Sequence, residues 1–154
     1  TPQNSLYVIN KMLVNFDSKV DDTVRQKISE SGYSIREILT IASMIEKETD
    51  GTDRTTIASV IYNRLNNVGE TYHKLQIDAS LIYGLGENYT GTLTSSDLNY
   101  NTPYNLSMYE GLPPTPIANP GLASIQAAPT TPIRTRACPP DPSPTPVWSP
   151  SLPR

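Results

Sequence analysis

Apolar side chains recur three and four positions apart along the first half of the chain, which is the spacing of one face of an α-helix. Ser34 stands at the head of one such stretch, and Glu37 follows three residues later, as in a capping box that starts a helix. Gly32 and Gly51 stand where helices should end. This pattern predicts four helices, over residues 4–16, 18–31, 34–49 and 52–67.

The pattern changes after the fourth helix. Residues 71–78 (TYHKLQID) alternate between apolar and polar side chains and predict a short strand or hairpin arm. Residues 79–86 (ASLIYGLG) predict a short helix closed by glycine, and residues 87–120, rich in Asn, Thr, Ser, Gly and Pro, predict a long loop. The expected fold class is therefore α+β, dominated by helices, with one short strand or hairpin element and long loops.

Composition divides the chain into a folded body, residues 1–127, and a tail, residues 128–154. Proline crowds the tail and apolar periodicity disappears there. Such a segment cannot bury enough surface to offset the entropy of ordering it, so we expect the tail to be disordered or non-native. The body is long enough for one ordinary domain.

Charge and cysteine content exclude several classes of function. The formal net charge is −3, without the basic stripe that a nucleic acid or an anionic membrane would require, so no nucleic-acid partner is expected. The single cysteine, Cys138, lies in the tail, so the body should use neither a disulfide nor thiol chemistry. No stretch approaches the ~20 apolar residues of a spanning helix, and an export or anchor segment would have to lie upstream of this sequence.

Glu46 interrupts the apolar run of the third helix. At about 100° per residue it falls between Ile35 and Leu39, within the arc expected to be buried. Burial and the nearby helix C-terminus both disfavour the charged form, so we expect the pKa of Glu46 to be raised. A glutamic acid that keeps its proton near neutral pH can act as a general acid, for example in cleaving a glycosidic bond. A second interpretation stays open, in which Glu46 pairs with Arg54 or Arg64 on the next helix.

Other candidate groups carry less chemistry. Glu48 lies roughly 200° around the helix from Glu46, so the two carboxylates should not converge on one bond, and we expect Glu48 to tie the helix end to the following turn. Asp50 and Asp53 lack the spacing of a calcium loop, and His73 is expected on the surface. No metal and no cofactor are expected. The solvent side of the third helix is expected to hold Arg36, Thr40, Ser43 and Lys47.

Longer stretches of the sequence closely resemble those of the endolytic murein transglycosylases, the MltG (YceG-like) family. They occur in the family's order and spacing, and they are LTIASMIEKET (39–49), IASVIYNRL (57–65), LQIDASLIYG (75–84), YN (104–105) and GLPPTPIANPG (111–121). The family's catalytic residue is the first glutamate of the EKET stretch, which corresponds to Glu46. The resemblance implies that residues 1–127 are the family's catalytic domain, incomplete at its C-terminus.

The resemblance also implies a mechanism that needs only one acid. Lytic transglycosylases of this kind cleave the bond between N-acetylmuramic acid and N-acetylglucosamine of peptidoglycan without adding water. Glu46 would protonate the leaving oxygen and then, as a carboxylate, remove the proton from the muramyl 6-hydroxyl. The product would end in a 1,6-anhydro ring.

Five residues of the matching stretches are candidates for glycan binding, namely Asn63, Gln76, Asp78, Tyr104 and Asn105. Gln76 offers an amide that can donate and accept, and Asn63 could line the groove or orient the catalytic glutamate. Asp78 could instead cap the helix that follows it. Tyr104 could stack on a sugar face while Asn105 bonds to that sugar, although a turn role for Asn105 stays open.

Partners and location follow from the resemblance alone. It implies peptidoglycan glycan strands as substrate and cell-wall synthases as partners. It also implies a full-length protein anchored in the cytoplasmic (inner) membrane by a segment absent here, with the catalytic domain on the extracytoplasmic or periplasmic face. Two other functions stay open: a catalytically impaired peptidoglycan-binding module, because the chain departs from the family pattern after residue 128, and a hydrolase that adds water.

Overall fold

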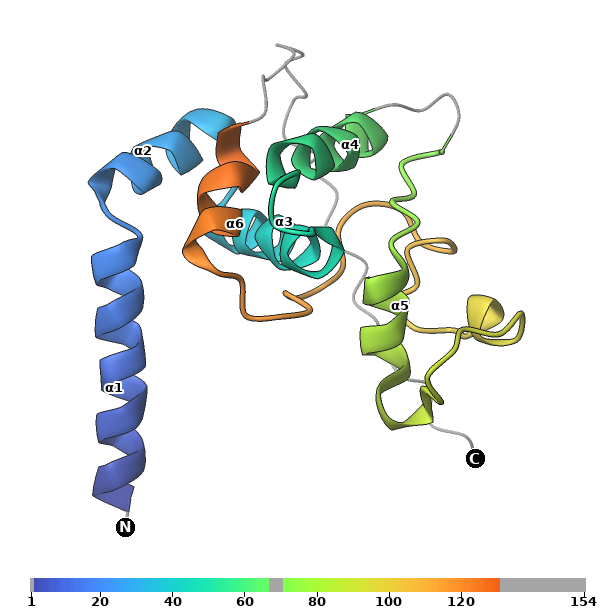
Figure 1. Ribbon diagram of the computed structural model, residues 1–154, viewed down its shortest axis with the longest axis horizontal. Helices are drawn as coiled ribbons and strands as arrows, with labels where there is room; N and C mark the ends of the chain where they lie inside the picture. The colour runs from blue at the N-terminus through green and yellow to red at the C-terminus, as the bar shows by residue number, and fades with distance from the viewer. Residues whose placement is uncertain (1, 67–70, 131–154) are drawn as a thin grey trace, which may run out of the picture.

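The computed structural model describes residues 2–66 and 71–130, which form a set of short helices and one long loop (Figure 1). The helices are α1 (Pro2–Lys19), α2 (Asp22–Ser31), α3 (Ile35–Glu48), α4 (Arg54–Asn66), α5 (Asp78–Leu85) and α6 (Leu122–Ala127). Single turns of 3₁₀-helix lie at Gly86–Asn88, Asp97–Asn99 and Ala128–Thr130. The five helices predicted from apolar spacing are confirmed, whereas α6 was not predicted.

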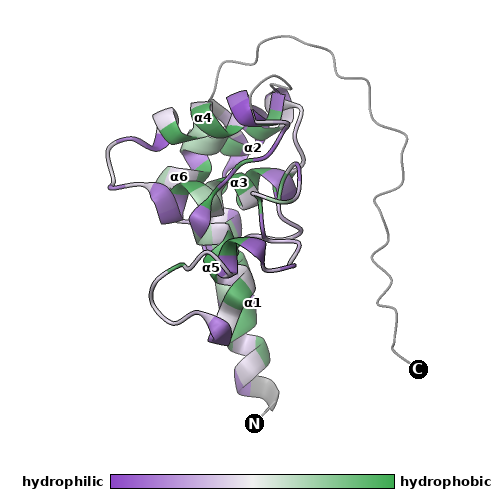
Figure 2. Cartoon of the chain, turned by 90° about the vertical axis from the view of Figure 1, so that its right-hand side faces the viewer, coloured by the Kyte–Doolittle hydropathy of each residue, from purple (hydrophilic) through white to green (hydrophobic). Residues whose placement is uncertain are grey.

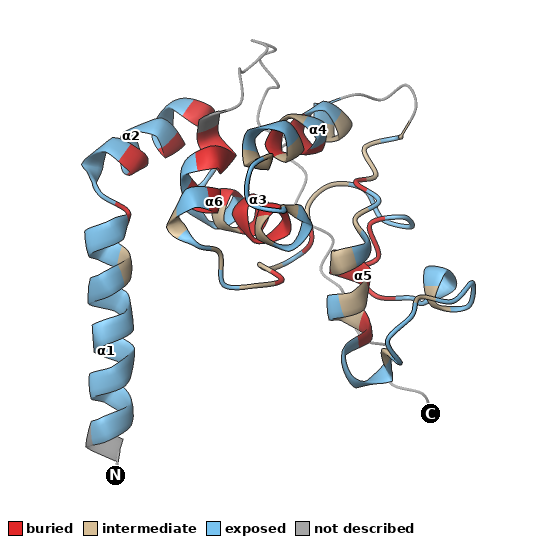
Figure 3. Cartoon of the chain, in the orientation of Figure 1, coloured by how far each residue is buried: buried red, intermediate tan, exposed pale blue. Residues whose placement is uncertain are grey.

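Helix α3 forms the centre of the core. It contacts α4, α5, α6 and the turn at residues 128–130, and its buried side chains are red in Figure 3. The predicted capping box is confirmed: Ser34 Oγ accepts from the Glu37 amide at 3.2 Å, and the Glu37 carboxylate accepts from the Ser34 amide at 2.7 Å. Gly32 ends α2 in a left-handed conformation with φ 77°. Local signals therefore set where α2 ends and α3 begins.

The expected strand or hairpin arm at residues 71–78 is wrong, and with it the α+β class. No strand occurs in the parts of the chain that the structure describes. Three residues of this segment, Tyr72, His73 and Gln76, have positive φ values of 49°, 60° and 54°, which break an extended backbone. Isolated backbone hydrogen bonds occur here in place of a β-ladder. The backbone N–H of Gln76 donates to Leu106 O at 3.1 Å, and the backbone N–H of Gly111 donates to His73 O at 2.9 Å. The segment alternates in polarity but has no neighbouring strand to pair with.

His73 also departs from the prediction. It is partly buried rather than free on the surface, and its Nδ1 lies 2.6 Å from the Leu65 carbonyl oxygen. The imidazole therefore helps to join the end of α4 to the segment that precedes α5.

Helix α5 and the long loop pack together as a second group beside α3, α4 and α6 (Figure 1). Ser80 Oγ donates to the Tyr104 carbonyl at 2.8 Å. A Cβ added at Gly84 would meet Thr102 and Tyr104 atoms at 2.9 Å, so only glycine permits this close approach. The long loop is thus an ordered part of the domain.

Both ends of the described chain bear on the predicted boundaries. Ala128, placed in the tail by composition, is fully buried, and Tyr62 Oη donates to its carbonyl at 2.9 Å. The rest of the predicted tail, residues 131–154, lies outside the described residues. At the other end α1 projects from the body with its apolar side chains exposed, as Figures 2 and 3 show. Within the described ranges, no helix is both long enough and apolar enough to span a bilayer.

Candidate functional site

Glu46 lies two residues before the end of α3, and its carboxylate is held by one oxygen. Ser124 Oγ donates to Oε2 at 2.6 Å, and the Gly121 amide donates to the same oxygen at 3.1 Å. No hydrogen bond to Oε1 is found within residues 2–66 and 71–130. The carboxylate is therefore fixed at Oε2 and free at Oε1.

Arg54, the first residue of α4, contacts Ser124, the residue that donates to Glu46. Its Nε donates to Ser124 Oγ at 3.2 Å, and its guanidinium also donates to the Gly51 carbonyl. The turn that leads into α4 is itself ordered, because Thr49 Oγ1 donates to Asp53 Oδ1 at 2.6 Å and accepts from the Gly51 amide at 2.9 Å. Thr49 and Asp53, and not Glu48 as expected, therefore join the end of α3 to the turn that follows it.

The alternative in which Glu46 pairs directly with an arginine is not what the structure contains. In the described ranges the ion pair found is Arg25 with Asp17, far along the chain from this site. Arg54 hydrogen-bonds to Ser124 rather than to Glu46, and Arg64 donates to the Leu75 carbonyl. Glu48 is exposed and makes no hydrogen bond or ion pair with the described residues.

The expectation of a raised pKa is wrong. The hydroxyl of Ser124, the amide of Gly121 and the charge of Arg54 lower the pKa of Glu46 from its ordinary value, and the opposing effect of burial does not outweigh them. Each of these donors favours the ionised form. Glu46 is therefore a carboxylate near neutral pH in the ligand-free protein.

The reason lies in which side of α3 is covered. The centre of the arc predicted to be buried is confirmed, with Ile38 0% exposed. At the edge of that arc, Ile35 is 39% exposed and Glu46 is only partly buried. Thr40 and Ser43, predicted to face solvent, are 3% and 0% exposed. The covered surface therefore extends onto the side predicted to face solvent, and the edge that carries Glu46 stays partly open.

The loop at residues 111–121 buries part of the side predicted to face solvent, because it crosses α3 at its hydroxyl-bearing residues. The Ile117 amide donates to Ser43 Oγ at 3.0 Å, and Arg36 donates to the Pro114 carbonyl at 3.0 Å. Small hydroxyl side chains let a backbone approach closely and supply it with an acceptor. This loop then delivers Gly121 to the carboxylate of Glu46.

Gly121 also keeps one side of the carboxylate uncovered. A Cβ at this position would lie 3.4 Å from Glu46 Oε2, 3.7 Å from Oε1 and 3.8 Å from Cδ. Any larger side chain would therefore lie over the carboxylate. The glycine leaves this approach open to a bound molecule.

The predicted glycan contacts are distributed over other elements. Asn63 on α4 and Gln76 and Asp78 near the start of α5 are exposed, and none of the three hydrogen-bonds to Glu46. Asp78 is the first residue of α5 and makes no capping bond, because the cap position is occupied by Ile77. These three side chains are free to contact a ligand.

Tyr104 and Asn105 differ sharply from each other. Tyr104 is partly buried, its Oη lies 2.7 Å from Thr115 Oγ1, and its ring meets that of Tyr83 edge-on at 4.9 Å. Asn105 is fully buried, and its Nδ2 donates to the carbonyls of Leu98 and Tyr100, each at 3.0 Å. The structure thus supports the turn role for Asn105 over sugar contact.

Three residues of this site were not singled out as a group from the sequence: Gly121, Ser124 and Arg54. Ser124 lies 78 residues after Glu46 in the sequence, and no periodicity connects them. The one available signal was the proline-rich stretch at residues 111–121, which is stiff enough to carry a chain across a helix in a defined path.

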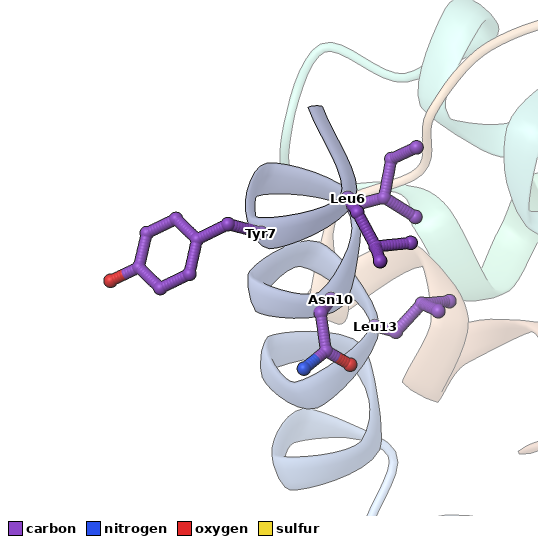
Figure 4. Close-up of a pocket in the computed structure, with 5 residues that line it drawn as sticks. Leu6, Tyr7, Asn10 and Leu13 are labelled. Carbon is purple, nitrogen blue, oxygen red and sulfur yellow. The ribbon is translucent and has the colours of Figure 1, made fainter. Parts of the chain in front are cut away.

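A depression lies on α1, away from these residues. Leu6, Tyr7, Ile9, Asn10 and Leu13 line it, and Figure 4 shows Leu6 and Leu13 on one side of the helix and Tyr7 on the other. One helix alone forms it, so it offers no enclosing walls. No group of three or more His, Cys, Asp or Glu side chains that could hold a metal ion is found in the described ranges.

Known proteins are similar to this chain in sequence, and one solved structure is similar to it in fold. The model of the YceG-like family matches residues 2–135. A protein of Bacillus subtilis (strain 168) named endolytic murein transglycosylase is 37% identical over 128 residues, covering 82% of this chain and 34% of that protein. One of the same name from Streptococcus pneumoniae (serotype 2) is 34% identical over 129 residues, covering 79% of this chain and 22% of that protein.

A crystal structure of a YceG-like protein from Listeria monocytogenes has a TM-score of 0.70 and 37% identity, covering 81% of this chain and 39% of that one. This chain thus spans about a third or less of the length of the two curated relatives.

Proposed function

This chain belongs to the YceG-like family, and on that premise we propose that it is the catalytic part of an endolytic lytic transglycosylase. The substrate is the glycan of peptidoglycan, cleaved between N-acetylmuramic acid and N-acetylglucosamine with formation of a 1,6-anhydro end. The observation that carries this proposal is the carboxylate of Glu46, held through one oxygen and open at the other.

The proposed reaction uses Glu46 twice. Protonated Glu46 gives its proton to the glycosidic oxygen as the bond to the muramyl C1 breaks. The carboxylate then takes the proton of the muramyl 6-hydroxyl while that oxygen bonds to C1. The proton is thereby returned to Glu46, no water is consumed, and no second carboxylate is needed.

The lowered pKa of Glu46 suits the second half of this cycle better than the first. Donors at Oε2 stabilise the carboxylate that forms after protonation of the leaving group. A bound glycan that displaces water from Oε1 would favour the protonated form and so prepare the first half. We expect kcat/KM to fall as pH rises above the pKa of Glu46, because the free protein must then acquire a proton before it can act.

The substitution Glu46→Gln tests the assignment. An amide is neither an acid nor a base, so we expect the rate of glycan cleavage to fall by about 100-fold or more. The measurement is mass spectrometry of murein digested by the 154-residue protein, in which 1,6-anhydromuramic ends identify a lytic transglycosylase. Glu48→Gln is the matched control, because Glu48 lies two residues away and is exposed; it should keep the wild-type rate.

Each other outcome points to a different function. Hydrated reducing ends would identify a hydrolase, and binding of murein without products would identify a glycan-binding module. Undiminished cleavage by Glu46→Gln would reject Glu46 as the catalytic residue.

We further propose that the longer protein holds this domain at the outer face of the cytoplasmic membrane, beside cell-wall synthases. Support comes from the name of the relatives, since murein lies outside that membrane. Protease added to intact, wall-stripped cells should digest a tag placed on this domain; complete protection of the tag would contradict the location.

A further inference from the structure

Resting on the proposed function, we propose that Ser124, oriented by Arg54, is a positioning residue that fixes Oε2 of Glu46 and thereby assigns proton transfer to Oε1. The proposal concerns three side chains from three helices, Glu46 on α3, Arg54 on α4 and Ser124 on α6. Ser124 follows the last of the stretches quoted above and lies within residues 2–135, which the family model matches.

The direction of the hydrogen bonds follows from chemistry. A guanidinium can only donate, so Arg54 Nε must give its proton to Ser124 Oγ at 3.2 Å. The hydroxyl has a single proton, and it lies 2.6 Å from Glu46 Oε2. An ionised carboxylate can only accept, so the hydroxyl proton of Ser124 is directed at Glu46 while one lone pair of Oγ accepts from Arg54.

Burial protects the hydrogen bonds of Ser124 to Arg54 and Glu46 from water. Ser124 is 0% exposed, so water cannot compete for its hydroxyl. The backbone carbonyl of Gly51, in a turn where Gly51 itself has φ 113°, receives a second donor of Arg54. The guanidinium is therefore held at two points, the Gly51 carbonyl and Ser124.

Within the part of the chain that the structure describes, no ionisable group other than Arg54 affects the pKa of Glu46. Arg54 is the charged residue that faces it from α4, while α6 and residues 111–121 contain no titratable side chain. On α3 itself the neighbours Lys47 and Glu48 are exposed. A change at Ser124 should therefore be read out at Glu46 without a compensating charge nearby.

The consequence for catalysis is that the two carboxylate oxygens have different roles, one held by donors and one available for proton transfer. Oε2 is occupied by two donors, Ser124 and Gly121, which also orient the plane of the carboxylate. Oε1 is left to exchange a proton with the glycan. Without the Ser124 hydroxyl, the carboxylate would keep one donor, the Gly121 amide, and could rotate.

The experiment is Ser124→Ala in the 154-residue protein, with the ionisation of Glu46 followed by ¹³C NMR of the side-chain carboxyl carbon. Glu46→Gln identifies the resonance by removing it. We expect the pKa of Glu46 to lie below its ordinary value in the wild type and to rise in Ser124→Ala, because the largest contribution favouring the charged form is lost. Arg54→Gln should raise it less, since Ser124 could still donate.

Ser80→Ala is the matched control for the titration. Ser80 is also 0% exposed and donates to a carbonyl, that of Tyr104, without contacting Glu46. The pKa of Glu46 should stay at its wild-type value in this variant. Thermal unfolding followed by circular dichroism checks that each variant is folded.

Kinetics provide the second measurement. The hydroxyl contacts Glu46 and not the glycan, so Ser124→Ala should lower kcat by about 10-fold to 100-fold with little change in KM. The pH at which kcat/KM falls should move upward together with the pKa of Glu46. Ser124→Thr, which keeps a hydroxyl, should recover part of the loss.

The outcomes separate this proposal from the proposed function. An unchanged pKa of Glu46 in folded Ser124→Ala, or an equal shift in Ser80→Ala, overturns the positioning role whatever the activity. A loss of kcat without movement of the pH profile likewise shows a merely structural serine. A shifted pKa in a protein that yields no anhydro products sustains the positioning role and rejects the transglycosylase.

Discussion

Helices α1 and α3 both carry apolar residues at helical spacing, yet these residues are exposed in α1 and mostly buried in α3. In α3 the side chains of Ile38, Ile41 and Ile45 are 0% exposed, whereas in α1 Leu6 and Leu13 are 70% and 61% exposed (Figure 3). Periodicity identifies a face that can be buried, but another segment must arrive to bury it. Around α3 that segment is the loop at residues 111–121 together with α4 and α6; around α1 no described segment does so beyond its last turn.

The comparison also shows that apolar content alone does not define the covered side. The loop packs on Ser43 of α3, whereas Ile35, at the edge of the apolar arc near Glu46, is 39% exposed. Backbone amides need acceptors when buried, and Ser43 supplies one where isoleucine could not. A polar side chain thereby becomes part of the core.

The largest effect is expected from truncating the centre of α3. Ile41→Ala removes a fully buried side chain and leaves a cavity among helices that all pack on α3, so the free energy of unfolding should fall by about 2–5 kcal/mol. Urea denaturation followed by circular dichroism measures it. A loss under about 1 kcal/mol would mean that α3 is not the centre of the core.

An intermediate effect is expected at Ser43. Ser43→Ala leaves the buried Ile117 amide without its acceptor, which should cost about 1–3 kcal/mol in the same denaturation experiment. Ser59→Ala is the matched control, because that hydroxyl donates only to the Thr55 carbonyl of its own helix, and its effect should stay within about 0.5 kcal/mol. Equal effects at the two serines would contradict the role given to the loop.

The smallest effect is expected on α1. Leu13→Ala shortens a side chain that is already exposed, so the free energy of unfolding should change by less than about 0.5 kcal/mol. Leu13→Ala, like Ile41→Ala, shortens an apolar side chain to alanine, but it should lower the free energy of unfolding several-fold less. A cost comparable to that of Ile41→Ala would show that the apolar face of α1 is covered in solution.

Local signals in the sequence were sufficient for the helices and some of their ends. The capping box at Ser34 and the glycine at residue 32 act on neighbouring backbone, so they could be predicted without the rest of the chain. The strand at residues 71–78 could not be decided this way, because alternation describes a strand only when a partner lies beside it. Instead, left-handed residues and single bonds to the loop replaced the ladder.

Local patterns along the chain were therefore enough to identify every α-helix except α6, the resemblance to the YceG-like family, and Glu46 within an apolar run. Tertiary structure decided which side of α3 stays open, which oxygen of Glu46 is held, and that its pKa is lowered and not raised. The physical reason is distance along the chain. Gly121 and Ser124 reach Glu46 only after the loop has crossed α3, and hydrogen bonds between segments so far apart leave no periodic trace in the sequence.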